Sequence, residues 1–191
     1  MPHIAIISSS VRTGRKSHRV VLYLQKYIES HQLASVEILD LKEYDFPVFN
    51  ERFSRQHEPT DKMKDFRDRI IQADGVIIVT PEYNGGYPAS LKNVVDFLYE
   101  EWHRKPVAIS TVSGGAFGGS QVITSLQFSL WKIRAWTVPA MFPLPKVQDN
   151  YDEEGDPADK EATDKRADHF IQELLWCMEA KAKMDESADK S

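Results

Sequence analysis

The chain has 191 residues, of which 41% are hydrophobic and 28% are charged, a mixture typical of globular proteins. This composition excludes a mainly disordered chain, and a chain of this length buries roughly 70% of its unfolded surface, enough for one core. The 24 basic and 29 acidic residues give a net charge of −5. Apart from Arg12, Arg15, Lys16 and Arg19 the basic residues are scattered, which argues against a nucleic-acid surface.

One cysteine, Cys177, can form neither an internal disulfide nor a zinc site built from several cysteines. The sequence therefore predicts a reduced, cytoplasmic protein. The N-terminal residues show no charged leader, and no run approaches the ~18 apolar residues of a membrane span. We expect neither export nor membrane insertion.

Short runs rich in β-branched apolar residues predict five strands. In chain order they are residues 4–7, 36–39, 76–79, 107–112 and 138–142. Apolar residues at helical spacing predict helices between and after them. The residues that define these helices are Val20, Leu24, Tyr27 and Ile28; Met63, Phe66 and Ile70; Leu91, Val94, Val95, Leu98 and Trp102; and Val122, Ile123, Leu126 and Leu130.

The end of the chain predicts a final helix that begins at Asp156 and Pro157, because these residue types are typical of an N-cap and a first helical position. The following segment, 179–191, is polar, and we expect it to be a frayed tail. No internal repeat is visible. The sequence therefore predicts a single domain over residues 1–178.

Alternating strands and helices indicate an α/β fold with a parallel sheet and helices on both faces, which is a doubly wound arrangement. Residues 4–7 and 76–79 are continuously apolar, as buried strands are, whereas 36–39 alternate and suggest an edge. Pro139 cannot donate to a sheet, so the fifth strand is placed at the opposite edge. The predicted order is 2-1-3-4-5, the flavodoxin-like order.

The loop after the first strand, residues 8–17, contains four serines and two arginines and leads into a helix. In such sheets ligands bind beyond the carboxyl ends of the strands, and a helix N-terminus with hydroxyls and arginines suits a terminal phosphate. The glycine patterns of dinucleotide and nucleoside triphosphate sites are absent. A polar turn with a serine cap is the alternative interpretation.

The loops after the third and fourth strands are rich in residues that shape the backbone. Residues 80–88 read Thr-Pro-Glu-Tyr-Asn-Gly-Gly-Tyr-Pro, and residues 113–120 contain four glycines. Loops of this kind can present backbone N–H and C=O groups to a flat ring without intervening side chains. Two ordinary turns are the less favoured alternative.

Residues 80–96, together with Glu101-Trp102 and Lys105-Pro106, resemble the NAD(P)H-dependent FMN reductases, above all the quinone-reductase branch of this flavodoxin-like family. The resemblance covers roughly residues 4–147, and the Thr-Pro-Glu-Tyr-Asn motif is its most specific part. One departure is Ser9, at a position where the family usually has glycine. The family includes flavin, quinone, azo-dye and chromate reductases.

The resemblance implies a set of FMN-binding residues in the three loops, with no separate catalytic residue and no metal. The phosphate would be held by Ser10, Arg12 and Ser17, with Arg15 as a neighbour. One edge of the ring would be lined by Pro81, Glu82, Tyr83 and Asn84, and the other by Ser113, Gly114 and Gly115.

The implied function is an oxidoreductase that passes hydride from NAD(P)H via flavin N5 to quinones, free flavins, azo compounds or similar small-molecule acceptors by a ping-pong mechanism. The alternative is a flavodoxin-type electron carrier that binds FMN without being an enzyme. The resemblance also implies a homodimer or homotetramer. Apolar surface for such an interface is expected near Trp131, Trp136, Met141 and Phe142.

Three further features carry weaker hypotheses. His103, beside Trp102, is interpreted as a helix-end residue rather than a catalyst, and Cys177, on an apolar helix face, as a buried structural thiol rather than a reactive one. The segment 42–59 shows no clear periodicity and is long for a connection. It is interpreted as an irregular surface segment, with a lid or a partner contact as alternatives.

Overall fold

A computed structural model describes residues 1–188. Five strands form one parallel sheet in the order β2-β1-β3-β4-β5, as the sequence predicts. The strands are β1 (His3–Ser8), β2 (Ser35–Asp40), β3 (Gly75–Pro81), β4 (Pro106–Val112) and β5 (Trp136–Leu144). The helices are α1 (Ser17–Ser30), α2 (Leu41–Tyr44), α3 (Asp61–Gln72), α4 (Ala89–Phe97), α5 (Ser120–Lys132), α6 (Val147–Asn150) and α7 (Lys160–Ala188), with 3₁₀ helices at Phe53–Arg55 and Glu100–Trp102.

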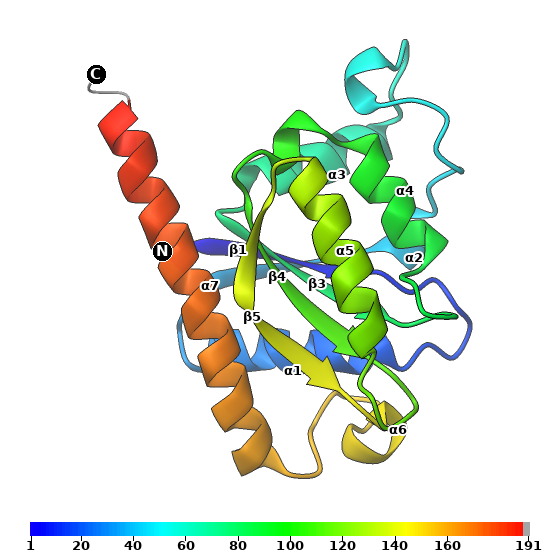
Figure 1. Cartoon of the computed structure of the whole chain (residues 1–191), viewed down its shortest axis with the longest axis vertical. Coiled ribbons are helices and arrows are strands. Elements are labelled where there is room, and N and C mark those ends of the chain that lie inside the picture. Colours follow the sequence, from blue (N-terminus) through cyan, green and yellow to red (C-terminus); the bar gives the residue numbers. More distant parts are fainter. Residues whose placement is uncertain (189–191) are drawn as a thin grey trace.

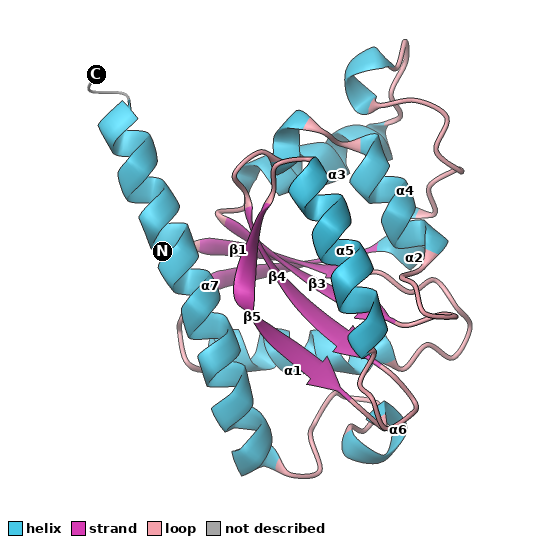
Figure 2. Ribbon diagram, in the orientation of Figure 1, coloured by secondary structure: helices cyan, strands magenta, loops and turns pink. Residues whose placement is uncertain are grey.

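Helices cover both faces of the sheet, which lies between them as a middle layer (Figures 1 and 2). Helices α1 and α7 pack on one face, and α3, α4 and α5 pack on the other. In β1, Ile4 and Ile6 belong to the first core, whereas Ala5 and Ile7 belong to the second, because successive side chains of a strand point to opposite faces. The central strands are apolar throughout for this reason.

The edge strand β5 contains an irregularity at the predicted proline. Val107 is paired with Thr137 and Ile109 with Met141, so three residues of β5, with Pro139 in the middle, lie opposite Ala108 alone. A proline has no N–H to donate, and a bulge in an edge strand accommodates it. Pro139 therefore explains both the place of β5 and its local distortion.

The segment 42–59 is an irregular surface segment, as the first of its three interpretations expected. It contains α2 and a 3₁₀ helix, and its aromatic side chains pack against α3 and α4. The Phe46 ring lies 5.5 Å from that of Phe66 and 6.0 Å from that of Phe97, and Phe53 also meets Phe97 edge-on at 5.6 Å. Aromatic packing thus holds this long connection to the body of the domain.

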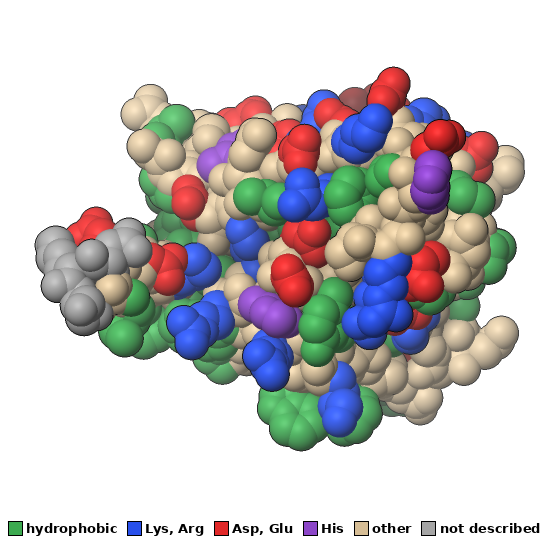
Figure 3. Space-filling model, turned by 90° about the horizontal axis from the view of Figure 1, so that it is seen from above, with side chains coloured by type: hydrophobic (Ala, Val, Ile, Leu, Met, Phe, Trp, Pro, Cys, Tyr) green, Lys and Arg blue, Asp and Glu red, His purple; other side chains and the backbone are tan. Residues whose placement is uncertain are grey.

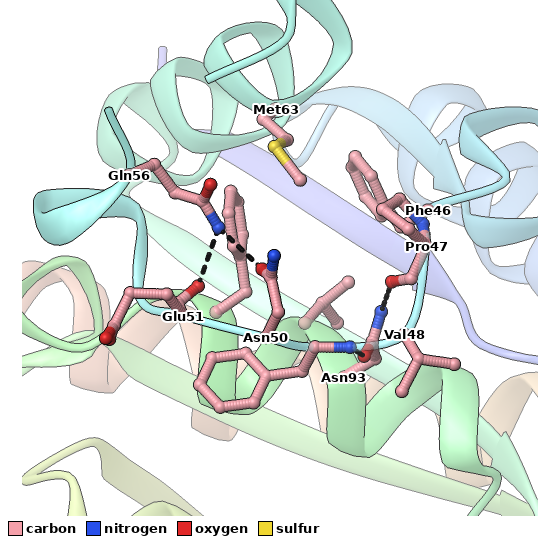
Figure 4. A pocket seen from close by; sticks show the side chains of 11 residues that line it. Phe46, Pro47, Val48, Asn50, Glu51, Gln56, Met63 and Asn93 are labelled. Atoms are coloured by element: carbon pink, nitrogen blue, oxygen red, sulfur yellow. Dashed lines mark hydrogen bonds between the residues drawn. The ribbon is translucent and has the colours of Figure 1, made fainter. Parts of the chain in front are cut away.

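Two amide side chains fix the path of the same segment (Figure 4). Asn93 of α4 donates to the Pro47 carbonyl at 2.7 Å and accepts from the Phe49 N–H. Gln56 donates to Asn50 and to the Glu51 carbonyl at 2.9 and 3.0 Å. The cavity between the segment and α4 measures about 10 Å³, so the packing is close.

Three expected boundaries differ from the structure. Helix α4 ends at Phe97, and Trp102 reaches the core from a separate 3₁₀ helix. The last helix begins at Lys160 rather than at Asp156, because Asp159 accepts the Ala162 N–H in the manner of an N-cap. Residues 179–188 continue α7 as a helix instead of fraying, and residues 189–191 of the expected tail lie outside the described part.

The described surface agrees with the composition. Lys, Arg, Asp and Glu side chains are interspersed over the described part of the face drawn in Figure 3. Within residues 1–188, no helix is both long enough and apolar enough to cross a membrane.

Candidate functional site

A pocket of about 320 Å³ lies beyond the carboxyl ends of β1, β3 and β4. This is the edge at which the sequence places a ligand, and the volume falls in the range of small-molecule sites, about 300–1,000 Å³. The lining residues are Ser10, Arg12, Gly14, Arg15, Lys16, Ser17, Pro81, Glu82, Tyr83, Val112, Ser113, Gly114, Val147 and Gln148. The structure thus brings together most of the predicted site residues in a single pocket.

The loop after β1 enters the site along a path fixed by Ser9. The N–H and the hydroxyl of Ser9 both donate to the Val79 carbonyl, at 3.2 and 2.9 Å, and Ser90 of α4 donates to the Ser9 carbonyl at 2.6 Å. Ser9 is fully buried, and its φ is not positive. A serine therefore replaces the family's glycine here without backbone strain.

Tyr83 joins the loop after β3 to the loop after β1. The hydroxyls of Ser10 and Tyr83 are 2.8 Å apart, and the Arg12 guanidinium lies 5.4 Å from the centre of the Tyr83 ring. Helix α1 begins next to these residues at Ser17. No side chain caps its N-terminus, so the N–H groups of its first turn have no capping side chain as a hydrogen-bond partner. This end of the pocket combines hydroxyls, a cation and a helix N-terminus.

Arg15 lies in the pocket wall, but its guanidinium is held by Asp40. One nitrogen donates to Asp40 at 2.5 Å and to the Ser10 carbonyl at 2.8 Å, and the other nitrogen also donates to Asp40. Burial acts to raise the pKa of Asp40, but the Arg15 hydrogen bonds, the Lys42 N–H and the Arg15 charge outweigh it, so this pKa lies below its ordinary value. Asp40 is therefore a buried carboxylate paired with Arg15.

The loop after β3 closes in a two-residue turn. Tyr83 and Gly86 exchange backbone hydrogen bonds of 2.8 and 3.1 Å around Asn84 and Gly85, both of which have positive φ. Asn-Gly is the residue pair that such a turn favours. Asn84 therefore lies exposed at the tip of the turn, and it is absent from the pocket lining, whereas Pro81, Glu82 and Tyr83 line it.

The loop after β4 is tied to the chain that follows β5. The Ser113 N–H donates to Leu144 and the Val147 N–H donates to Ser113, at 3.0 and 3.1 Å. Gln148 of α6 donates to the Gly114 carbonyl at 3.1 Å. Ser113 and Gly114 line the pocket, whereas Gly115, which accepts from the Ser113 hydroxyl, is absent from the lining.

The pocket also contains residues that the sequence did not assign to it. In the sequence Lys16 stands out only as part of the basic cluster, and Gly14, Val112 and Val147 carry no motif of their own. Gln148 had no signal at all, because it comes from a four-residue helix after the last strand. Its place becomes visible only when β5 brings α6 beside the loop after β4.

The residues with weaker hypotheses lie outside the pocket lining. His103 follows the 3₁₀ helix Glu100–Trp102 as its C-cap, as expected for a helix-end residue. Cys177 is buried, and burial raises the pKa of its thiol, which agrees with a structural role. Among residues 1–188, no cluster of three or more His, Cys, Asp or Glu side chains could hold a metal ion.

Comparisons with known proteins agree with this site. The model of the NADPH-dependent FMN reductase family matches residues 2–149. The chain is 36% identical over 137 residues to the NAD(P)H-dependent FMN reductase LOT6 of Saccharomyces cerevisiae, covering 65% of this chain and 71% of LOT6. It is 36% identical over 122 residues to a quinone reductase of Pseudomonas putida, covering 61% of this chain and 62% of that one.

Among solved structures, the chain resembles FerB, a flavoenzyme NAD(P)H:(acceptor) oxidoreductase from Paracoccus denitrificans. The TM-score is 0.73 at 24% sequence identity, and the match covers 94% of this chain and 98% of FerB, so the two share a fold. The family match spans the whole sheet and all three loops of the pocket. The chain is therefore an oxidoreductase that belongs to the NADPH-dependent FMN reductase family.

Proposed function

We propose that this protein binds FMN in the pocket and uses it to pass electrons from NAD(P)H to quinones, free flavins, azo compounds or similar small acceptors by a ping-pong mechanism. The observation that carries the proposal is the division of the pocket into two chemically different ends. One end offers hydroxyls, cations and a helix N-terminus, and the other offers the backbone of two loops with Gly114 in its lining. An FMN molecule has a phosphate for the first end and a flat ring for the second.

The charges of the first end fit a phosphate. Arg15 and Arg19 are paired with Asp40 and Glu153, whereas no ion pair involves Arg12 or Lys16 within residues 1–188. Two unpaired cations match a phosphate charge of about −1.5 to −2, and the first turn of α1 adds N–H donors. In this proposal Arg12 and Lys16 neutralise the phosphate, and Ser10 and Ser17 bind its oxygens.

The second end would hold the ring through the backbone of two loops. Pro81, Glu82 and Tyr83 approach from β3, and Ser113 and Gly114 approach from β4. The Glu82 carboxylate accepts the Gln121 N–H at 3.2 Å, which fixes its loop against the start of α5. Bound FMN supplies the redox chemistry, and these residues supply its position and the polarity around it.

A ping-pong mechanism is expected because donor and acceptor would both have to occupy the same exposed face of the flavin. NAD(P)H would have to leave the pocket before the acceptor could occupy the same place. Initial rates measured with several fixed acceptor concentrations should give parallel lines in double-reciprocal plots against NADPH or NADH. Intersecting lines would contradict the mechanism, and an absence of turnover with every small acceptor would favour the electron carrier.

We also propose that the protein is a homodimer or homotetramer. On α5, Phe128 and Trp131 are 61% and 65% exposed, with their rings 5.8 Å apart, and Met141 of β5 is 46% exposed. Adjacent exposed apolar side chains are typical of an interface. The expectation that Phe142 contributes is wrong, because its side chain points inward and stacks on Phe170.

Light scattering at micromolar concentration tests this assembly. We expect at least a dimer, and we expect Trp131→Glu to convert it to a monomer. Trp176→Glu is the matched control, because Trp176 is 64% exposed on α7, away from α5. A wild-type monomer with full activity would contradict the proposed assembly.

We place the protein in the cytoplasm, and the observation that supports this is the lone, buried Cys177, which suits a reducing compartment. Fractionation of the native cells should recover the protein with cytoplasmic markers. Recovery with the medium or with organelle contents would contradict the placement.

A further inference from the structure

The ion pair between Arg15 and Asp40 lies at the junction of three elements around the pocket. Asp40 ends β2, Arg15 precedes α1, and Ser10 belongs to the loop after β1. The side chains of Arg15 and Asp40 are only 13% and 6% exposed. The two terminal nitrogens of Arg15, Nη1 and Nη2, both donate to Asp40, and Nη1 also donates to the Ser10 carbonyl at 2.8 Å.

Asp40 is in turn fixed from its own side. Its carboxylate accepts the Lys42 N–H at 3.0 Å as the N-cap of α2, and parallel pairing places Asp40 directly beside Ser8 of β1. The pair therefore connects the edge strand to the loop after β1. Through the bond from Arg15 to the Ser10 carbonyl, this ion pair also fixes the backbone of a residue that lines the pocket.

The opposite side of the same loop is held by Tyr83, which meets the Ser10 hydroxyl and the Arg12 guanidinium. Ser10 is thus held at its carbonyl by Arg15 and at its side chain by Tyr83. A binding loop is precise only when its supporting contacts are made before the ligand arrives. Arg15 and Asp40 make that contact on the β2 side.

We propose that Arg15 and Asp40 are a positioning pair for the phosphate of FMN: Arg15 does not bind the phosphate but fixes Ser10 and Arg12 so that they can. This inference rests on the proposed binding of FMN in the pocket. It assigns a role in the site to Asp40, which lies 25 residues from Arg15 in the sequence and belongs to no motif of the site. It also separates Arg15 from Arg12, although both stand in the same short basic cluster.

The competing interpretation is that Arg15 leaves Asp40 and contacts the phosphate directly. That movement would leave the buried Asp40 carboxylate without its guanidinium partner, with only the Lys42 N–H at 3.0 Å and His18 Nδ1 at 3.9 Å beside it, which is strongly unfavourable. It would also release the Ser10 carbonyl. The two interpretations predict opposite effects when Asp40 is changed, and this difference makes the pair testable.

The test measures the dissociation constants of FMN and of riboflavin, which lacks the phosphate, by flavin fluorescence for each full-length variant. In Asp40→Asn, removal of a negative charge near the phosphate would strengthen FMN binding if Arg15 were a direct ligand. A positioning pair predicts the reverse, a loss of about tenfold or more in the preference for FMN over riboflavin, the scale typical of lost outer-shell contacts. An unchanged or increased preference overturns the proposal.

Two further variants keep the test decisive if Asp40→Asn does not fold. Asp40→Glu retains the charge but displaces the carboxylate, so the preference for FMN should fall for a positioning pair and stay unchanged for a direct Arg15 contact. Arg15→Lys retains the charge of Arg15 but loses the two-nitrogen grip. Added to Asp40→Glu, it should cause little further loss, and additive losses would overturn the proposal.

Glu37→Gln is the matched control, because Glu37 is an acidic residue of the same strand, paired with His3 and Arg69 outside the pocket. Its preference for FMN should equal that of the wild type. Riboflavin binding reports whether each variant retains a folded site. A wild-type protein that binds neither flavin would refute the proposed function itself, whereas normal FMN binding with insensitive Asp40 variants would refute only the positioning pair.

Discussion

The glycines after β4 fall into two groups with different physical roles. A Cβ on Gly115 would have no heavy atom within 4 Å, and one on Gly114 would have only Gln148 Oε1 at 3.4 Å. Gly118, by contrast, has a φ of +63°, and a Cβ there would meet Leu144 and Pro143 at 3.2 Å. The fold needs Gly118, whereas no close contact within the chain opposes a side chain at Gly114 or Gly115.

Substitution of these glycines should separate flavin binding from stability. We expect Gly114→Val, in the pocket lining, to weaken FMN strongly and Gly115→Val, beside the lining, to weaken it less. Both should change the free energy of unfolding of the apoprotein by only about 0.5 kcal/mol, as at an open surface site. Gly118→Val, the control from the same loop, should lower stability. Denaturant midpoints and FMN dissociation constants are the measurements.

A core residue supplies the opposite control. Ile77 is fully buried in the central strand β3, so Ile77→Ala should cost roughly 2–5 kcal/mol of stability and leave FMN affinity in the folded fraction nearly unchanged. If both valine variants bind FMN as the wild type does, the loop after β4 does not hold the ring.

Arg12 should distinguish FMN from riboflavin. A charge-assisted contact with phosphate is worth roughly 1.5–3 kcal/mol, and riboflavin has no phosphate to make it. Arg12→Ala is therefore expected to weaken FMN about tenfold or more and riboflavin much less, as measured by fluorescence titration. Arg55→Ala, at an exposed position outside the pocket lining, is the control. Equal weakening of both flavins would remove Arg12 from the phosphate site.

At this scale the sequence indicates residue types better than it indicates partners. Ser10, Arg12, Tyr83 and Gly114, which the family resemblance implies for the site and which stand in loops after central strands, line one pocket. The partner of Arg15 was not identifiable from the sequence, since Asp40 is 25 residues away in the chain and meets Arg15 only through the pairing of β1 with β2. Asn84 was assigned to the pocket by its motif, but turn geometry places it at the exposed tip.

Among the elements, the C-terminal end of α3 is held by a buried lysine from another part of the chain. Lys105, just before β4, donates to the carbonyls of Ile71 and Ala73 at the end of that helix and is 7% exposed. Burial, and to a smaller extent the Lys181 charge on α7, lower the pKa of Lys105 to about 8 against the opposing charges of Asp74 and Asp185. The helix end therefore depends on a group that titrates in an accessible range.

The lowered pKa of Lys105 predicts a pH-dependent stability. Between about 8 and the ordinary value of 10.5, the unfolded chain binds more protons than the folded one, so stability from this group increases with pH. The unfolding free energy of the wild type minus that of Lys105→Met should therefore rise across this range, by at most about 3 kcal/mol. Urea titrations at several pH values measure it, and a flat or falling difference would contradict the prediction.

Element types were easier to predict than element ends. The apolar spacing that identified α4 also included Trp102, because a core aromatic after a break keeps the same face toward the sheet as a helical one. Asp156 and Pro157 have the composition of a helix start, but Pro157 instead pairs with Tyr151 in an isolated bridge. Local composition could not decide between two aspartates three residues apart.

For the whole molecule, the strand order followed from a few residues. Continuous apolar runs in β1 and β3 indicated central strands, and Glu37 and Pro139 indicated the edges, as the sheet shows. The path of segment 42–59 could not be predicted, since it depends on Asn93 and on aromatic contacts with α3 and α4 rather than on a repeating pattern. Topology thus followed from hydrophobic pattern, whereas irregular chain depends on individual contacts.

The pocket's position at the carboxyl edge of the sheet makes one measurement the most direct test of the proposed activity. The purified, FMN-loaded chain is mixed with NADPH or NADH without oxygen or any acceptor, and its visible flavin absorbance is followed. We predict that one nicotinamide bleaches the bound flavin in a single turnover and that a quinone added afterwards restores the colour. A chain that retains no FMN, or whose flavin neither nicotinamide bleaches, would contradict the proposed reductase.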